Sequence, residues 1–155
     1  MGKVARADGV TARVAAHLSG LSLAMIDYLG REELVLPSAS PGRIRGRRRS
    51  FSFGDVVTLR IVARLLSSGI EIRRLKDQLQ RLKVRLAAIT PEEIPYRYLV
   101  TDGCELFIES DQGHLVTAAG AQFAFAFLID LHQPRQEVLD QAQREFGGWE
   151  NALAA

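Results

Sequence analysis

Apolar residues recur every three or four positions up to about residue 89, which is the spacing of amphipathic helices. The pattern predicts two short helices followed by two longer ones. We expect these helices at residues 11–18, 22–30, 52–66 and 70–88. The first two are separated by Ser19-Gly20-Leu21, where Gly20 can take the positive φ that other residues avoid. The sequence therefore predicts two short helices joined by a tight turn.

Small polar side chains stand where three of these helices are expected to begin. Thr11, Ser22 and Ser52 can each accept a hydrogen bond from a backbone N–H that the first helical turn leaves without a partner. Asp55, at the third position after Ser52, adds a weak form of the capping box. Gly69 is of the type that commonly follows the end of a helix. These residues support the predicted boundaries.

The segment between the second and third helices is expected to be a wing. Residues 33–37 are mostly apolar and end at a proline, which predicts a short strand. Residues 38–46 are rich in Ser, Pro, Gly and Arg and are typical of a loop. Residues 47–51 are then expected to return as a second strand. The pattern therefore predicts a two-stranded wing.

The hydrophobic period changes after residue 90. Residues 90–95 contain two prolines and mark a boundary. Beyond it, a two-residue alternation predicts short strands, followed by a helix that ends at two glycines. We expect strands at residues 96–101, 105–109, 114–117 and 123–131, and a helix at residues 135–146. The second half is therefore expected to be a small antiparallel β-meander with a terminal helix.

Charge is distributed unevenly along a chain whose net charge is only +2. Residues 1–89 carry 17 Lys and Arg against 7 Asp and Glu, or +10, whereas residues 90–155 carry 3 against 11, or −8. Such polarity favours a first half that faces nucleic acid and a second half with a different role. The simpler alternative is two solvated surfaces of opposite sign.

The composition argues against several other classes of protein. A single cysteine, Cys104, leaves no disulfide within the chain and no multi-cysteine zinc site. No apolar run approaches the roughly 20 residues that cross a bilayer, and no secretory signal is visible, so we expect a cytoplasmic protein without membrane contact. His17, His114 and His132 lack the spacing of metal ligands, and no catalytic set of side chains is visible. We therefore expect neither an enzyme nor a bound cofactor or metal.

Ala16 stands four positions before Gly20, where a helix-turn-helix needs a small residue so that its two helices can cross closely. With the stretches that follow, the chain resembles the MerR family of transcriptional regulators over about residues 11–82. The residues that carry the resemblance are Ile26-Asp27-Tyr28, Leu34-Val35-Leu36-Pro37, Arg49-Ser50-Phe51-Ser52, Asp55, Val56, Leu59, Leu65-Leu66-Ser67-Ser68-Gly69-Ile70 and Leu75. The resemblance implies a winged helix-turn-helix that binds DNA.

Three positions depart from the family pattern. Asp27 stands in place of an arginine, Leu29 in place of an aromatic residue and Glu33 in place of a glycine. An acidic side chain on a recognition helix can accept a hydrogen bond from a cytosine amine, but it repels phosphates. The departure at Asp27 therefore bears on how bases are read.

Pattern and resemblance together predict an α+β protein in three parts. Residues 1–10 are expected to be a flexible tail. Residues 11–89 are expected to form a winged helix-turn-helix domain of four helices and a two-stranded wing. Residues 90–155 are expected to form a small acidic β-domain with a terminal helix, which would serve dimerisation, effector binding or partner binding.

The second helix is expected to enter the major groove, and the wing to contact phosphates or an adjacent minor groove. The candidate DNA-binding residues are Thr11, Ser22, Leu23, Met25, Asp27, Tyr28, Arg31, Arg43, Arg45, Arg47, Arg48, Arg49 and Ser50. Five closely spaced arginines on a loop are hard to explain by packing, although a solubilising loop or a partner-binding patch is an alternative. We interpret Arg73, Arg74 and Arg81 as a solvated helix face.

The aromatic strand at residues 123–131 is the best candidate for a protein interface. Phe123, Phe125, Phe127 and Ile129 share one side of this strand. An edge strand of this kind can pair with its twin in a dimer, and its alternative role is the core of the β-domain.

We therefore expect a sequence-specific transcriptional regulator that binds a two-fold symmetric operator in double-stranded DNA as a homodimer. The fourth helix is followed at once by Thr90-Pro91, so a long dimerising coiled coil is not evident. Two alternatives stay open. One is an antitoxin-type protein whose acidic half masks a toxin partner while its basic half represses. The other is an excisionase-like architectural protein that bends DNA with little sequence preference.

Overall fold

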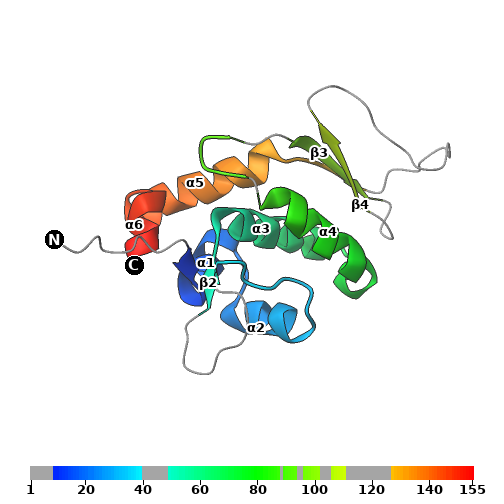
Figure 1. Cartoon of the computed structure of the whole chain (residues 1–155), viewed down its shortest axis with the longest axis horizontal. Helices are drawn as coiled ribbons and strands as arrows, with labels where there is room; N and C mark the ends of the chain where they lie inside the picture. The colour runs from blue at the N-terminus through cyan, green and yellow to red at the C-terminus, as the bar shows by residue number, and fades with distance from the viewer. Residues whose placement is uncertain (1–8, 40–48, 88, 94–95, 102–105, 111–126) are drawn as a thin grey trace.

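The computed structural model describes residues 9–39, 49–87, 89–93, 96–101, 106–110 and 127–155 (Figure 1). The helices are α1 (Ala12–Ser19), α2 (Leu23–Arg31), α3 (Phe53–Ser67), the 3₁₀-helix η1 (Ile72–Leu75), α4 (Lys76–Leu86), α5 (His132–Phe146) and α6 (Trp149–Ala154). The strands are β1 (Val10–Thr11), β2 (Ser50–Phe51), β3 (Tyr96–Thr101), β4 (Leu106–Ser110) and β5 (Phe127–Asp130). No helix in this part of the chain is long and apolar enough to cross a membrane.

Helices occur at the four places that the periodicity predicts in the basic half. Thr11 and Ser22 cap α1 and α2 as expected, because each side-chain oxygen accepts from the backbone N–H three residues later, at 3.2 and 3.1 Å. Ser52 and Asp55 form a complete capping box at the start of α3, where a weak variant was expected. The fourth helix differs from the prediction, because residues 72–75 form the 3₁₀-helix η1 before α4 begins.

The predicted strand at residues 33–37 is wrong. Glu33 has a positive φ of 56°, and the backbone N–H groups of Leu34 and Val35 both donate to the carbonyl of Leu29, at 2.8 and 3.3 Å. Leu34 and Val35 are buried, so this apolar run closes the end of α2 and fills the core. A short apolar run fits either role, and only tertiary packing decides between them.

β1 takes the place of that predicted strand beside β2. The two strands are antiparallel, with Val10 opposite Phe51 and Thr11 opposite Ser50. The sequence places Val10 in the N-terminal tail, but its side chain is buried, as is that of Phe51. The short β1–β2 ladder therefore ties the chain before α1 to the chain before α3.

The acidic half contains an antiparallel sheet with the strand order β4-β3-β5. β3 has the predicted bounds, and β4 is shifted by one residue from the predicted strand. The predicted strand at residues 114–117 lies outside the described residues. Of the predicted strand at residues 123–131, the structure describes β5 at residues 127–130.

Two helices follow the sheet. α5 begins at His132 and not at Arg135, and it has Pro134 in its first turn, where a missing backbone N–H is tolerated. It ends as predicted at Gly147, which has a left-handed conformation. The sequence pattern does not predict α6, because its six residues are too few to show a helical period.

α3 is the central helix of the fold. Every residue from Phe53 to Leu59 is buried, as are Ile61, Val62 and Leu65. α1, α4 and α5 pack around it. The ring of Phe53 meets Trp149 of α6 edge to face, with ring centroids 5.0 Å apart and planes at 82°.

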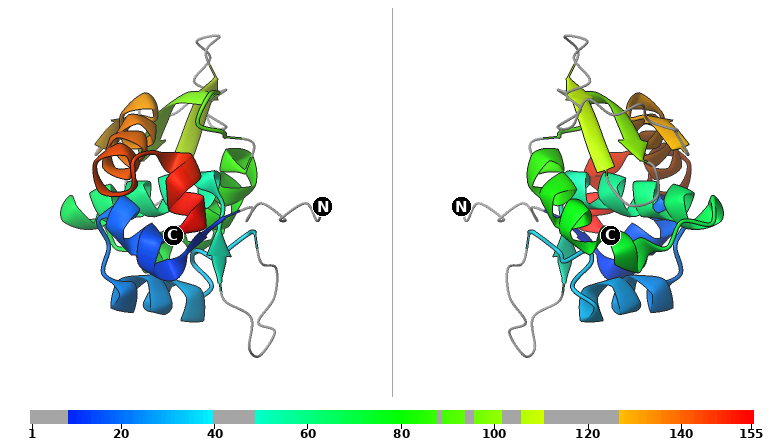
Figure 2. Two further views of the ribbon diagram at one scale, coloured as in Figure 1. Left: turned by 90° about the vertical axis from the view of Figure 1, so that its left-hand side faces the viewer. Right: turned by 90° about the vertical axis from the view of Figure 1, so that its right-hand side faces the viewer.

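The helices of the acidic half complete the core of the basic half. Val138 and Ala142 of α5 and Ala152 of α6 are fully buried in the same cluster as the apolar residues of α1 and α3. Both views in Figure 2 place α2 at one edge of the molecule and the three-stranded sheet at the opposite edge. The division of the chain at residue 90 stays a prediction, and the packing shows that the parts on its two sides share one core.

Ion pairs fasten α5 to α3. The carboxylate of Glu137 accepts from Nε of Arg60 at 2.7 Å and from Nη2 of Arg64. A second guanidinium nitrogen of Arg64 donates to the side-chain oxygen of Gln133 at 3.2 Å. Burial acts to raise the pKa of Glu137, but the hydrogen bonds and charges of Arg64 and Arg60 outweigh it and hold this pKa below its ordinary value. The carboxylate is therefore stabilised in its charged form.

Candidate nucleic-acid interface

The turn between α1 and α2 fixes the relative orientation of the two helices. Gly20 has a φ of 79°, and its backbone N–H donates to the carbonyl of Ala16 at 3.1 Å. The hydroxyl of Ser19 accepts from the backbone N–H of Leu21 at 3.2 Å. A Cβ at position 20 would also lie 3.0 Å from a guanidinium nitrogen of Arg60. Glycine is therefore favoured here both by its backbone conformation and by the space available.

α2 has one buried face and one exposed face. Ile26 and Leu29 are buried in the core. The exposed residues of α2 and its cap are Ser22, Leu23, Ala24 and Arg31. Leu23 is a large apolar side chain at 45% exposure, whereas Met25 and Tyr28 are half-buried and pack against the core. Ala24 is not among the candidates from the sequence, because a small apolar side chain carries no chemical signal for DNA contact.

Asp27 is paired with Arg49. Its Oδ1 lies 2.5 Å from Nη2 of the arginine, and the two side chains are 46% and 40% exposed. The ion pair joins α2 to the chain just before β2. It also offsets the negative charge that Asp27 brings to a helix on which the family pattern has an arginine.

Asp55 holds the two ends of the wing, at Ser38 and Ser52, by hydrogen bonds. This carboxylate is 2% exposed, and its Oδ2 accepts from both the backbone N–H and the hydroxyl of Ser38, at 2.7 and 2.6 Å. The same oxygen accepts from the backbone N–H of Ser52 at 2.9 Å. Sequence reasoning found the link to Ser52 but missed the link to Ser38, because no local pattern connects positions 17 residues apart.

The wing itself is described only at its base. The backbone N–H of Ala39 donates to the carbonyl of Ser50 at 3.2 Å, and Ser50 is half-buried in β2. Four of the predicted arginine contacts lie outside the described residues. These are Arg43, Arg45, Arg47 and Arg48. Of the five wing arginines, Arg49 is therefore the one that the structure places beside α2.

α4 supports the segment that follows α2. Nζ of Lys83 donates to the carbonyl of Leu36, and the side-chain amide of Gln80 donates to the carbonyl of Glu33 at 3.3 Å. Burial lowers the pKa of Lys83, with the charge of nearby Asp55 acting in the opposite sense. Lys83 therefore ties α4 to the segment that follows α2.

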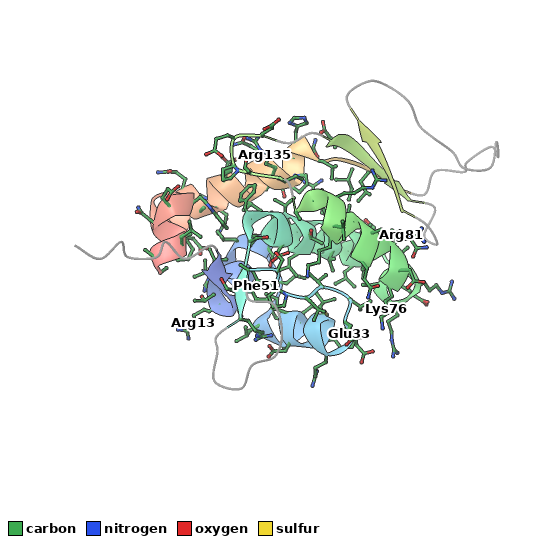
Figure 3. The ribbon with its side chains drawn as sticks, in the orientation of Figure 1. Arg13, Glu33, Phe51, Lys76, Arg81 and Arg135 are labelled. Carbon is green, nitrogen blue, oxygen red and sulfur yellow. The ribbon has the colours of Figure 1, made fainter. Side chains whose placement is uncertain are left out.

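Other basic residues lie on two separate surfaces. Arg13 of α1 is exposed and projects outward beside α1 and β2 (Figure 3). Arg81 lies on the outer side of α4, away from Arg13 (Figure 3). Arg73 pairs with Glu32 at 3.5 Å, an exposed contact that fits the interpretation of this helix face as solvated.

The predicted protein interface falls on β5 and the residues before it. Phe123 and Phe125 lie outside the described residues. β5 is at one edge of the sheet as far as the structure describes it, and Ile129 is 1% exposed. The buried position of Ile129 agrees with the alternative role of these residues as core, and their part in a dimer stays a prediction.

Comparison with known proteins covers the helix-turn-helix part of the chain. Residues 10–82 match the model of the family described as MerR HTH family regulatory protein. An uncharacterized HTH-type transcriptional regulator of Mycobacterium bovis is 34% identical over 71 residues, and two such regulators of Mycobacterium tuberculosis strains match equally well. The matched stretch spans 46% of this chain and only 32% of each relative.

The family match begins with β1 and ends within α4. It contains the α1–turn–α2 unit, the base of the wing and the central helix α3. Residues 10–82 of this chain are therefore similar to the helix-turn-helix domain of the MerR family of regulatory proteins.

Proposed function

We propose that this chain binds double-stranded DNA through α2 and the wing and thereby regulates transcription. The observation that carries the proposal is the exposed start of α2, with Leu23 and Ala24 uncovered and Arg49 beside the helix. Two further facts support it. The relatives bear the name of transcriptional regulators, and residues 1–89 have a net charge of +10.

We propose α2 as the helix that enters the major groove. The major groove of B-DNA is about 12 Å wide and admits one α-helix. The hydroxyl of Ser22 accepts from the backbone of Met25 but keeps its own proton for donation to a base or phosphate. Leu23 offers an apolar contact to a thymine methyl group. Ser22 and Leu23 are therefore proposed to contact bases.

Arg49 is proposed to contact a phosphate while Asp27 holds it in place. A guanidinium has five N–H donors, and the pair with Asp27 involves Nη2. The remaining donors can reach the DNA backbone at no loss of the ion pair. Phosphate contacts of this kind position the protein without reading the sequence.

The finer proposal is a homodimer on a two-fold symmetric operator. This proposal rests on the resemblance to the MerR family, whose members bind DNA as dimers, and on the position of β5 at the edge of the described sheet. α4 ends at Leu86, and among the described residues it is followed by a turn at residues 89–93, with no helix to serve as a coiled coil. We therefore propose that the dimer forms through the acidic half.

The test is selection of randomised duplex DNA by the purified protein, with sequencing of the retained pool. We expect an enriched inverted repeat, whose half-site spacing would report the geometry of the dimer. Retention without enrichment would replace sequence-specific regulation by an architectural role. Absence of retention at moderate salt would overturn the DNA-binding proposal and favour a protein partner, such as the toxin of an antitoxin-type pair.

Point variants separate backbone contacts from base contacts. The double variant Arg47→Ala with Arg49→Ala should weaken binding to every duplex, whereas Ser22→Ala should change the preferred sequence. Arg81→Ala, on the outer side of α4, is the control for loss of positive charge away from the wing. An arginine pair without effect on affinity would show that the wing assignment is wrong.

A further inference from the structure

A groove of about 750 Å³ opens on the surface beside α1, between the two halves of the chain. α1 supplies one wall with Arg13 and His17, and the start of α2 adds Leu23. Arg49 lies at the wing side. The opposite wall comes from the end of α5, more than a hundred residues later in the sequence, with Glu145 and Phe146. The groove therefore exists only because α5 packs against the helix-turn-helix.

Two arginines, Arg13 and Arg49, line a groove whose other walls are mostly apolar. Arg13 and His17 lie one helical turn apart on the same face of α1. Arg13 is exposed and forms no salt bridge with any side chain that the structure describes. Glu145 is the acidic side chain of the lining, and its Oε2 lies 3.2 Å from Nδ1 of His17. The positive charge that the groove offers to a ligand is therefore chiefly that of Arg13, because Arg49 is paired with Asp27 and Glu145 lies against His17.

The groove is continuous with the surface that we propose to contact DNA. Leu23 and Arg49 belong to both, because Leu23 is the first residue of α2 and Arg49 pairs with Asp27 of the same helix. A helix in the major groove has a sugar–phosphate strand on either side. With α2 in the major groove, we expect one of these strands to pass close to the N-terminal end of α2, where the groove lies.

We propose that this groove receives the sugar–phosphate backbone that flanks the base pairs contacted by α2, with Arg13 as a phosphate contact and Glu145 as a restraint on affinity. The proposal rests on DNA binding by α2. Charge complementarity favours a phosphate strand as the occupant, and the open shape of the groove fits a strand that passes through. Glu145 opposes the same phosphates and also holds His17, so the acidic half of the chain would limit how tightly the basic half binds DNA.

The experiment measures affinity for a fluorescein-labelled duplex of mixed sequence, several helical turns long, by fluorescence anisotropy. Phosphate contacts do not depend on sequence, so the operator need not be known. The full-length chain and its Arg13→Ala and Glu145→Gln variants are titrated between about 50 and 200 mM salt. Arg81→Ala is the charge-matched control, and circular dichroism checks that each variant is folded.

We expect Arg13→Ala to weaken binding by roughly three- to tenfold at low salt and to make the salt dependence shallower by about 0.9 in log–log slope. Glu145→Gln should tighten binding by up to about fivefold at low salt, the range of a single exposed charge interaction. Arg81→Ala should change the affinity less than Arg13→Ala does.

Other outcomes overturn the proposal in distinguishable ways. If the unaltered chain binds DNA and Arg49→Ala weakens it, while Arg13→Ala matches Arg81→Ala, then DNA binding stands and the groove is not a backbone site. If Glu145→Gln leaves affinity unchanged or weakens it, the restraint by α5 is refuted. If the unaltered chain does not bind the duplex at low salt, both the proposed function and this inference fail.

Discussion

A single buried carboxylate organises the point where the wing meets the helices. Oδ2 of Asp55 accepts three hydrogen bonds, two from Ser38 and one from the backbone of Ser52. Replacement by alanine would leave these partly buried donors without this acceptor and remove the half of the capping box that the Asp55 side chain supplies. We expect Asp55→Ala to lower the free energy of unfolding by about 2–3 kcal/mol.

Urea denaturation followed by circular dichroism measures this loss at residue 55. Asp55→Asn is the control, because its amide oxygen can still accept while the charge is gone, so it should lose less than Asp55→Ala. Equal losses in the two variants would show that the charge of Asp55 matters more than its hydrogen bonds.

For single residues, the sequence predicts a contact only when its two partners lie close together along the chain. The caps at Thr11, Ser22 and Ser52 follow from a side chain and a backbone N–H three residues apart, and all three occur. The pair of Asp27 with Arg49 and the bond of Ser38 to Asp55 join distant positions. Such contacts depend on the fold, so no pattern along the chain indicates them.

Among the elements, the connection after α2 departs furthest from its prediction. The mostly apolar run of residues 33–37 predicts a short strand, but the turn at Glu33 folds it back onto Leu29. The family pattern has a glycine at this position, and a φ of 56° is the conformation for which glycine is favoured. The sequence shows that Glu33 replaces the glycine of the family pattern, but only the positive φ in the structure explains why glycine is favoured there.

The strain at Glu33 leads to a stabilising substitution. An L-residue in the left-handed region is strained, and glycine relieves this strain at the cost of some extra freedom in the unfolded chain. We expect Glu33→Gly to raise the free energy of unfolding by about 0.5–1 kcal/mol, measured from the urea midpoint. Glu33→Ala keeps the strain and should give no gain. A gain for alanine as large as that for glycine would point to the charge of Glu33 as the cause.

The junction of α3 and α5 should respond to acid. The pKa of Glu137 is lowered from its ordinary 4.5, chiefly by Arg60 and Arg64 acting against burial. The folded state therefore favours the carboxylate, and this stabilisation is fully present above about pH 4.5 and is lost as the pH falls through the lowered pKa. Glu137→Gln should make the unfolding free energy fall less steeply on acidification.

Urea denaturation from about pH 7 down to about pH 3 measures the response of Glu137. Glu150→Gln removes an exposed carboxylate of α6 and is the matched control. If Glu137→Gln and Glu150→Gln have the same acid dependence as the unaltered chain, Glu137 does not contribute to it.

For the whole molecule, the charge pattern of the sequence separates a basic half from an acidic half, whereas in the structure the two halves pack into one core. The sign change near residue 90 is real, yet α5 and α6 lie against α1, α3 and β1 in one core. Charge patterning reports what each segment shows to solvent. It carries no information on which buried faces meet, since Val138 and Ala142 could equally have covered the sheet of their own half.

Trp149 provides the test of whether the two halves fold as one unit. Its ring packs edge to face on Phe53 at the start of α3, so Trp149→Ala should lower the free energy of unfolding by about 2–4 kcal/mol, while Trp149→Phe retains part of this contact. If the core is shared, hydrogen exchange of the α3 amides should accelerate in Trp149→Ala by the factor that corresponds to the loss in global stability. Two separate unfolding transitions, with the exchange of α3 unchanged, would show instead that the helix-turn-helix holds its structure without α6 and that the acidic half can leave it.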